Sequence, residues 1–600
     1  MLLAKLKERW MSKNTDSLVD LEKRARLFRL LQRFAPVLSF VLFFIGIIWI
    51  LILPYDGYSK GTYISENALL PGQANVEYGY NDIKTAEDYI HKLSRVQDKD
   101  SETRAQFIQK EFRLSGFVSA VQHFTFDNNG YNTKGANAFA IHKAPRSDGK
   151  EALILSAPWV SRTGEYNTNG IALLLSLAKL FKRNVYWAKD IILLVTDQGK
   201  AGTQAWLDAY HGMEDGDEFS AIVMPRSGTI QGAVNLDFPG TQDYETLGIF
   251  FGILKNLLEG VNGQLPNLDL INTIVAVVER SNLPIAITLH DTTKHPFSDI
   301  KDNEYLRSLF NMLNSMRFLV LGHPSSDAGL YLRYRIDAVT IHGILGTTNL
   351  NNLFGFSRIG RLPKCIADVI LNLYIYSLVL YYLGTTPIIT NLSEKEKTVL
   401  ATLPAKKHHH LFALTILIIT HAAGVIIFNI IQPSFAREYL ARFPGETAIG
   451  IQFGASLGIF CATILLLIIW ISKSKSPEHD GTILKSFCLA ESALVIASVS
   501  LLNFTLGIAT ALLILIPYSL TRPSTRLFWK CVQTLILVTL SPSGLATLFG
   551  ALTETSLVHI LSTLLFDYQT FGSWFLTYTC IVYWPINMAM IALVFTQTLS

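Results

Sequence analysis

Cysteine is scarce in this sequence and is absent from its first 364 residues. The five cysteines, at positions 365, 461, 488, 531 and 580, all lie in or beside strongly apolar stretches. Residues 54–363 must therefore fold without a disulfide framework, even if they face an oxidising compartment. A segment of about 310 residues can form a hydrophobic core large enough for that.

Histidine and acidic side chains are sparse in the loop 157–170, where an α/β enzyme would place its catalytic groups. Residues 151–170 read EALILSAPWVSRTGEYNTNG, an apolar run followed by a polar loop and a helical pattern that begins at Gly170. This order is typical of a strand, a loop and a helix start. The loop has no histidine, no cysteine and one carboxylate, Glu165, so it offers few groups for acid–base or metal chemistry.

Long apolar runs, by contrast, are abundant, and half of all residues are apolar. Stretches of about 20 uncharged residues can cross a bilayer as a helix. Eight such stretches occur, at 37–53, 365–383, 411–432, 447–472, 485–503, 505–520, 528–550 and 574–598. The sequence therefore predicts a cytosolic basic segment (1–36), a transmembrane signal anchor (37–53), one large domain (54–363) and a membrane domain with about seven spans (364–600).

The basic residues predict the orientation, because cytosolic flanks of spans collect lysine and arginine. Nine of them precede Pro36, whereas the loop 551–573 has none. With alternating spans, the N-terminus is cytosolic, the large domain lies on the opposite side and the C-terminus returns to the cytosol. No small-residue cleavage site follows the first apolar run, which favours a retained anchor.

Within the large domain, helical and strand patterns alternate. Helices are predicted at 85–96, 104–114, 170–181 and 203–210, and strands at 117–126, 136–144, 151–157, 189–197, 221–225 and 232–237. This alternation predicts an α/β sheet with helices on both faces. Sites in such sheets lie at the carboxyl ends of the strands, here residues 156–159, 196–198 and 235–237.

The order of these elements resembles that of zinc aminopeptidases with a co-catalytic metal pair, which implies a central mixed sheet. Asn167 and Gly170 match the loop of that family. The resemblance places the first metal-binding histidine near Ala157 and its partner aspartate near Trp159. The remaining metal-ligand positions fall at Glu165 or Tyr166, at the pair Asp197–Gln198, at Asp237 and at the late histidine His342.

Most of these ligands are missing. Two zinc ions need about four or five nitrogen or oxygen ligands and an open position for water, but Ala157 is apolar and Gln198 is neutral. We therefore expect a fold that has lost hydrolysis, with no metal, no cofactor and no catalytic residue of its own. Two interpretations of the polar positions stay open: a remnant pocket that binds a substrate or a single ion, or residues that only cap helices and pair with arginines. These positions are Glu165, Asp197, Gln198 and Asp237.

The whole domain order, with the segments EALILSAPW, EYNTNGIALLLSLAKLF and WAKDIILLVTDQGKAGTQAWL, resembles the GPI anchor attachment subunits of GPI transamidase. This resemblance implies a multi-pass protein of the endoplasmic reticulum membrane that recognises or presents the GPI glycolipid for attachment to protein C-termini. It implies as partners the other transamidase subunits, including a caspase-like cysteine protease subunit, together with the GPI glycolipid, the C-terminal signal of the proprotein and the membrane, and no nucleic acid. The alternative is a metallopeptidase-like or amide-forming enzyme that acts through the acidic positions.

In the membrane half, three glycines at four-residue spacing predict a close contact between helices, because small residues let two backbones approach. They are Gly450, Gly454 and Gly458. Glu491 lies inside a span, which predicts that it faces other helices and favours a structural hydrogen bond over a proton relay.

Prolines interrupt the last two spans, at Pro542 and Pro585, and each frees a backbone carbonyl. In the family that the chain resembles, the last span is associated with GPI binding. The candidate contacts are therefore Tyr583, Trp584, Pro585 and Asn587. A packing kink without a ligand remains the alternative.

Overall fold

The computed structural model describes residues 41, 44–52, 55, 78–128, 131–185, 187–212, 225–240, 244–250, 262, 264, 267–280, 286–289, 304–324, 326–345, 410–432, 443, 445–473 and 480–596. Two compact units are present, Met1–Gly61 with Pro296–Met312, and Thr62–His295 with Leu313–Ser600. In the first unit, residues 41 and 44–52 are helical, within the predicted anchor, and Tyr305 Oη donates a hydrogen bond to Leu51 O at 2.7 Å. The predicted boundaries of the four segments stay predictions.

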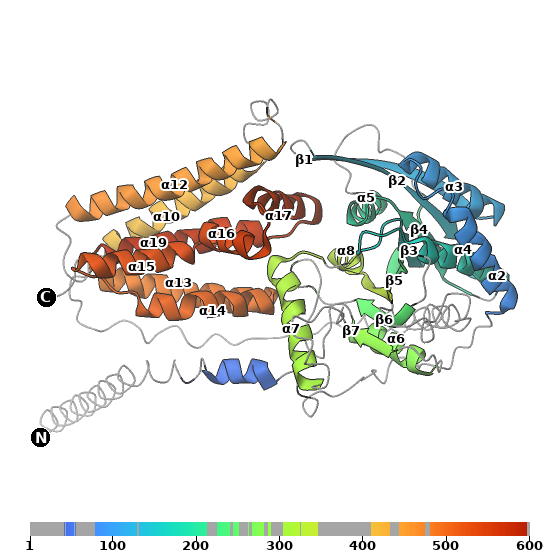
Figure 1. Cartoon of the computed structure of the whole chain (residues 1–600), viewed down its shortest axis with the longest axis horizontal. Helices are drawn as coiled ribbons and strands as arrows, with labels where there is room; N and C mark the ends of the chain where they lie inside the picture. The colour runs from blue at the N-terminus through green and yellow to red at the C-terminus, as the bar shows by residue number, and fades with distance from the viewer. Residues whose placement is uncertain are drawn as a thin grey trace, which may run out of the picture. The chain divides into compact units, whose positions relative to one another are not determined.

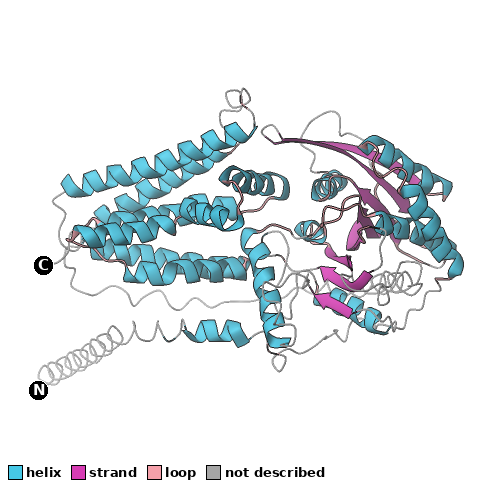
Figure 2. Ribbon diagram, viewed as in Figure 1, coloured by secondary structure: helices cyan, strands magenta, loops and turns pink. Residues whose placement is uncertain are grey.

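The α/β part of the chain alternates helices and strands (Figures 1 and 2). Its helices are α2 (Tyr80–Leu93), α3 (Ser101–Leu114), α4 (Thr168–Arg183), α5 (Lys200–His211), α6 (Leu268–Arg280), α7 (Glu304–Leu321) and α8 (Ala328–Arg333). Its strands are β1 (Val118–Asn128), β2 (Tyr131–His142), β3 (Glu151–Pro158), β4 (Asp190–Thr196), β5 (Thr229–Asp237), β6 (Tyr244–Phe250), β7 (Ala286–Leu289) and β8 (Asp337–Leu345). The four predicted helices are present, and so are the predicted strands, except that 221–225 lies almost entirely outside the described residues.

The strands form one mixed sheet in the order β1-β2-β4-β3-β5-β8-β6-β7. Strands β4, β3, β5 and β8 are parallel neighbours, whereas β2 pairs antiparallel with β4, and β6 antiparallel with β8. The carboxyl ends of the four parallel strands therefore meet at one edge. The three predicted strand ends belong to β3, β4 and β5, and they lie at this edge, as the sequence predicted.

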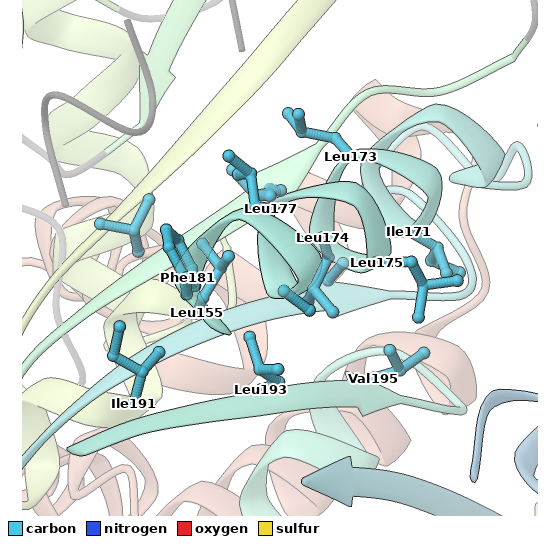
Figure 3. Packing of buried hydrophobic residues seen from close by; sticks show 14 of the residues in the cluster. Leu155, Ile171, Leu173, Leu174, Leu175, Leu177, Phe181, Ile191, Leu193 and Val195 are labelled. Carbon is cyan, nitrogen blue, oxygen red and sulfur yellow. The ribbon is translucent and has the colours of Figure 1, made fainter. Parts of the chain in front are cut away.

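Helices cover both faces of the sheet, which confirms the predicted fold class. Successive residues of a strand point to opposite faces, and β3 shows this, because Leu155 belongs to one hydrophobic cluster and Ile154 to another. The Leu155 face is covered by α2, α3, α4 and α6, and the Ile154 face by α5 and α8. Figure 3 shows the first of these layers, where Leu174 and Phe181 of α4 lie over Leu155 of β3 and Leu193 of β4.

The C-terminal part is helical (Figure 1). It contains α10 (His410–Ile431), α12 (Gly445–Lys473), α13 (Asp480–Leu502), α14 (Phe504–Leu520), α15 (Leu527–Thr539), α16 (Pro542–Thr553), α17 (Leu557–Phe571), α18 (Phe575–Tyr578), the π-helical turn η4 (Thr579–Tyr583) and α19 (Trp584–Val594).

Four segments of the described chain are single helices long and apolar enough to cross a membrane, namely Leu411–Ile431, Thr447–Lys473, Ile483–Leu502 and Phe575–Val594. The pair α15 and α16 would make a fifth if it counts as one span bent by 68°. These helices agree with the predicted membrane domain. The predicted span 365–383 lies outside the described residues, and the total of eight spans stays a prediction.

Most of the predicted connection 551–573 between two spans is helix α17, which is not among the described helices long and apolar enough to cross a membrane, and its place between two spans stays a prediction. Ser556 caps this helix by accepting a hydrogen bond from His559 N at 3.2 Å. Its apolar residues recur at helical spacing, but the run is broken by the buried Asp567. A search for long uncharged stretches misses such a helix.

The last span is the central helix of this part. In its apolar window 83% of the residues are buried, against 22–33% in the other three spans. Pro585 has no backbone N–H to donate, and the turn η4 before it accommodates this with wider π-type spacing. Gly424 of α10 packs directly against this turn, since a Cβ atom there would lie 2.5 Å from Cys580 O and 2.5 Å from Pro585 Cγ.

Substitution Gly424→Ala should therefore destabilise the helical part. Overpacking of this kind costs about 1–3 kcal/mol, and we expect the thermal midpoint of the purified chain in detergent to fall by roughly 2 °C or more. The control is Gly458→Ala, where the new methyl group meets no atom within 4 Å. Equal midpoints for the two variants would contradict the close approach of α10 to the last span.

Candidate functional site

The loop between β3 and α4 is held by one buried amide rather than by catalytic groups. Asn167 is fully buried and caps α4 by accepting from Gly170 N at 3.2 Å. Its side-chain amide donates to Pro158 O and Leu236 O at 2.9 and 2.7 Å, and its oxygen accepts from Phe238 N at 2.7 Å. Asn167 thus connects the carboxyl ends of β3 and β5 to the start of α4, which explains why this loop keeps its shape.

Asp197, at the end of β4, is buried and neutralised by an arginine. Arg104 Nη2 of α3 lies 2.7 Å from Asp197 Oδ1, and both side chains are at most 9% exposed. Ser101 Oγ donates to the other carboxylate oxygen, and the Asp197 backbone N–H donates to Asn137 Oδ1 at 3.0 Å. The Arg104 guanidinium also lies 5.2 Å from the ring centre of Trp159. A carboxylate held in this way is occupied by its structural partners.

Asp237, at the end of β5, pairs with a histidine of the neighbouring strand. His342 lies opposite Asp237 in the β5–β8 register, and its Nδ1 is 2.8 Å from Asp237 Oδ2. Asp237 Oδ1 is buried and has no hydrogen-bond partner within the described part of the chain. His342 and Asp237, which the sequence resemblance assigned to two metal-ligand positions, are thus in direct contact.

A second buried acid, Asp327, lies close to Asp237. It precedes α8 and accepts a hydrogen bond from Thr203 Oγ1 of α5 at 3.1 Å. Burial raises the pKa of Asp327 to about 6, and the negative charge of Asp237 adds to this, while Lys200 and the Thr203 hydrogen bond oppose it. Because both acids are buried and close together, it is costly for both to be ionised at this edge of the sheet.

Lys200 and His323 continue this network to the helical part. Lys200 Nζ donates to Pro324 O and lies 3.0 Å from His323 Nε2, and His323 Nδ1 lies 2.8 Å from Asp567 Oδ2 of α17. An ammonium group only donates hydrogen bonds, so His323 Nε2 accepts and Nδ1–H donates to Asp567. Phe571 of α17 is buried in the same hydrophobic cluster as Trp206 and Tyr331 of the α/β part.

The four predicted pocket residues differ in burial and in the partners that hold them. Asp197 and Asp237 are buried but held by different partners, whereas Glu165 and Gln198 are exposed. No group of three or more His, Cys, Asp or Glu side chains in the described ranges is arranged to hold a metal ion. With Ala157 apolar and Asp197 paired to Arg104, the residues present do not fit a two-zinc centre.

Two of the candidate residues of the last span donate hydrogen bonds to backbone carbonyls near the break between α15 and α16. Tyr583 Oη donates to Leu540 O at 2.5 Å, and Asn587 Nδ2 donates to Leu537 O at 3.0 Å. Both carbonyls lie at the break between α15 and α16 that Pro542 imposes. Trp584 Nε1 and Asn587 Oδ1 are buried and lack a hydrogen-bond partner among the residues that the structure describes.

No described part of the chain packs closely against the three glycines of α12. A Cβ atom added at Gly450, Gly454 or Gly458 would meet nothing within 4 Å. The described helices of this chain therefore do not supply the predicted close contact.

Sequence reasoning missed Arg104 and Lys200, and it did not predict that Asp327 is buried next to Asp237. Arg104 had a detectable signal, because it stands at helical spacing from Ile108 and Phe112 on the apolar side of α3. An arginine on an apolar face indicates a buried anion. Asp327 and Lys200 had no such signal, since their proximity depends on how α5 and α8 pack on the sheet.

Comparison with known proteins now identifies the family. One family model, described as "Gaa1-like, GPI transamidase component", matches residues 134–367 and 350–591, which is more than half of the chain. The chain belongs to this family. The resemblance stated from the sequence is thereby confirmed.

Two curated relatives share the description of GPI transamidase component. The chain is 30% identical over 360 residues to GAA1 of Saccharomyces cerevisiae, covering 59% of this chain and 52% of the relative. It is 30% identical over 321 residues to gaa1 of Schizosaccharomyces pombe, covering 53% of each. The chain thus spans about half the length of the curated relatives it matches.

Solved structures with similar folds include hydrolases and cyclases. A zinc aminopeptidase of Bacillus subtilis aligns with a TM-score of 0.32 at 10% identity, covering 50% of this chain and 96% of that chain. A glutaminyl cyclase of Fimbriiglobus ruber aligns with a TM-score of 0.31 at 14% identity, covering 51% and 98%.

The raised pKa of Asp327 predicts a pH-dependent stability. The folded protein keeps this proton up to about pH 6, whereas the reference carboxyl releases it near 3.8. The contribution of protonated Asp327 to the free energy of unfolding is therefore fully present below about pH 4. It is lost as the pH rises through about 6, and the total loss is about 3 kcal/mol. In Asp327→Asn the side chain is neutral throughout, so we expect its thermal midpoint to fall less than that of the wild type between pH 4 and 7. If the thermal midpoints of wild type and Asp327→Asn changed with pH in the same way, the raised pKa of Asp327 would be contradicted. Asp98→Asn, at an exposed position, is the control.

Proposed function

We propose that this chain is a non-hydrolytic component of a GPI transamidase that recognises or presents the GPI glycolipid in the endoplasmic reticulum membrane. The nucleophile would come from a caspase-like cysteine protease subunit of the same complex, which acts on the C-terminal signal of the proprotein. The family membership supports the assignment to the complex.

The state of Asp197 supports the non-hydrolytic role. A metal-bound hydroxide needs a cation held by several ligands, but the cation next to Asp197 is the guanidinium of Arg104. An arginine neutralises the carboxylate and supplies no water-derived nucleophile. Hydrolysis at this edge of the sheet would require the ion pair to open first.

The observation that carries the proposed lipid role is the pair of unsatisfied polar atoms in the last span, Trp584 Nε1 and Asn587 Oδ1. A buried polar group without a hydrogen bond costs about 1–3 kcal/mol, so a bound ligand with polar groups would be favoured there. Pro585 lies about 16 Å below the start of the span near Trp574, at 1.5 Å per residue. This depth suits the glycerol and upper acyl region of a lipid better than its sugars, which would extend toward the α/β domain.

Substitution Trp584→Phe tests this role, because it removes the N–H donor and keeps an aromatic ring against Phe460, whose ring centre is 5.8 Å away. We expect the GPI that co-purifies with the complex, measured by mass spectrometry, to fall roughly threefold or more, as for the loss of about 1 kcal/mol. The other subunits should stay attached. Trp574→Phe is the matched control, and a wild-type amount of GPI in Trp584→Phe would exclude this span as the lipid contact.

The proposed orientation places the N-terminus in the cytosol and the α/β domain in the lumen. Gly149 lies in an exposed turn between β2 and β3, where we expect an inserted tag to be tolerated. An epitope tag there should bind antibody only after the internal membranes are opened, whereas one placed at the N-terminus should bind in cells whose plasma membrane alone is permeabilised. The reverse pattern would refute the orientation.

We also propose that the glycine stripe of α12 packs against a helix of another subunit. The open space beside Gly450, Gly454 and Gly458 supports this, because small residues favour close helix contacts in lipid. We expect the Gly454→Leu variant to lose partner subunits, while the thermal midpoint of the isolated chain stays unchanged. Retention of every subunit would argue against it.

A second candidate function is an amide-forming enzyme. The pair of His342 and Asp237 favours it, since a carboxylate that orients a histidine is a common general-base arrangement. Asp237→Asn in the assembled complex separates the two functions. Loss of transamidation with normal GPI binding and normal subunit content would support the enzyme, and unchanged activity would leave only the non-hydrolytic component.

A further inference from the structure

His421 of α10 and Glu491 of α13 form a polar pair in the middle of two predicted spans. His421 is the central residue of the span Leu411–Ile431, and Glu491 lies near the middle of Ile483–Leu502. Their side chains meet with 2.8 Å between His421 Nε2 and Glu491 Oε1. The sequence predicted that Glu491 faces another helix, and His421 is the residue it meets.

The hydrogen bonds of His421 determine what the pair can be. His421 Nδ1 lies 2.9 Å from the backbone oxygen Leu417 O, which only accepts, so Nδ1 carries a hydrogen. One further proton then lies between Nε2 and the carboxyl group. Whether that proton is on the histidine or on the glutamate, the pair has no net charge. It can therefore exist at this depth in the membrane.

The pair is not enclosed by the described helices of this chain. The side chains of His421 and Glu491 remain 31% and 26% exposed. Glu491 Oε2 can form a second hydrogen bond, because a carboxyl group has four lone-pair sites and the described residues provide one contact, from His421 to Oε1. Polar groups exposed to hydrocarbon are costly, since acyl chains form no hydrogen bonds.

Apolar side chains extend the exposed area along both helices. Ile418 and Val425 of α10, one turn before and one after His421, are 60% and 43% exposed. On α13, Leu494 is 69% exposed and Ser498 is also exposed, one and two turns beyond Glu491. We name this surface the α10–α13 face: Ile418, His421, Val425, Glu491, Leu494 and Ser498. These residues cover about two turns of each helix, and the polar contact between His421 and Glu491 lies among them.

We propose that the α10–α13 face binds a transmembrane helix of a partner subunit, which donates a hydrogen bond to Glu491 from a polar side chain near its own midpoint. Lipid headgroups lie at the membrane surfaces and acyl chains carry no donor, so at this depth the donor must come from protein. The proposal rests on the proposed function only in that it requires the chain to be part of a membrane complex.

The experiment places the photoreactive residue p-benzoylphenylalanine at Leu494 in the full chain in its native membrane, with Leu535 of α15, 68% exposed, as the matched control position. We expect an adduct at Leu494 with a membrane-spanning peptide of another transamidase subunit. Glu491→Leu should lower its yield roughly threefold to twentyfold, the effect of one polar contact between membrane helices. Glu491→Gln, which keeps an acceptor oxygen, should retain most of it.

The outcomes separate this proposal from the proposed function. An adduct with residues 365–383 of the same chain, an adduct with lipid alone, or an unchanged yield in Glu491→Leu would overturn the docking site. If transamidase subunits co-purify while Leu494 forms no protein adduct, the docking site fails and the proposed function stands. An adduct with a membrane helix of an unrelated protein supports the docking site and contradicts the proposed function. The double variant His421→Leu/Glu491→Leu, which leaves no unpaired polar group, should have the thermal midpoint of the wild type and still show the lower yield.

Discussion

The ion pair between Arg104 and Asp197 determines what the carboxyl edge of the sheet can do. A carboxylate that is 1% exposed is stable only if a cation or several donors compensate it. Arg104 and Ser101 supply that compensation, the Trp159 ring lies against the Arg104 guanidinium, and these contacts join α3 to the ends of β3 and β4. In a two-zinc enzyme the metal charge would balance such a carboxylate. Here Arg104 provides the cation that balances Asp197.

The same requirement for paired polar groups shapes the membrane part. Pro542 ends α15 and starts α16, and the carbonyls exposed at that break receive hydrogen bonds from Tyr583 and Asn587 of the last span. The break between α15 and α16 depends on the hydrogen-bond donors of the last span. This dependence accounts for the position of the last span at the centre of the helices. The polar residues around Pro585 thus have a structural role before any ligand is considered.

The sequence predicted the sheet well because β3 and β4 carry continuous apolar runs and α4 a clear helical pattern. It also predicted which strand ends meet. It did not predict the partners of the acids, since Arg104 lies about 90 residues from Asp197 and Lys200 more than 120 from His323. Such pairs depend on how helices pack on the sheet. Helix α17 was missed because it is short and contains Asp567, which becomes acceptable only through His323.

Helix α17 explains how the two chemically different parts of the second unit can act together. Its Phe571 is buried in the α/β core, its Asp567 is bound by His323, and the chain enters the last span only a few residues later, where Asn262 binds both Gly572 O and Trp574 N. Hydrogen bonds join Lys200 to His323 and His323 to Asp567 of α17, and the charge of Lys200 also acts on the buried Asp327. A change in the charge of Asp327 would act on Lys200 directly and on α17 through His323. The start of the last span is thus held through Asn262 and through the contacts of α17 with the α/β part.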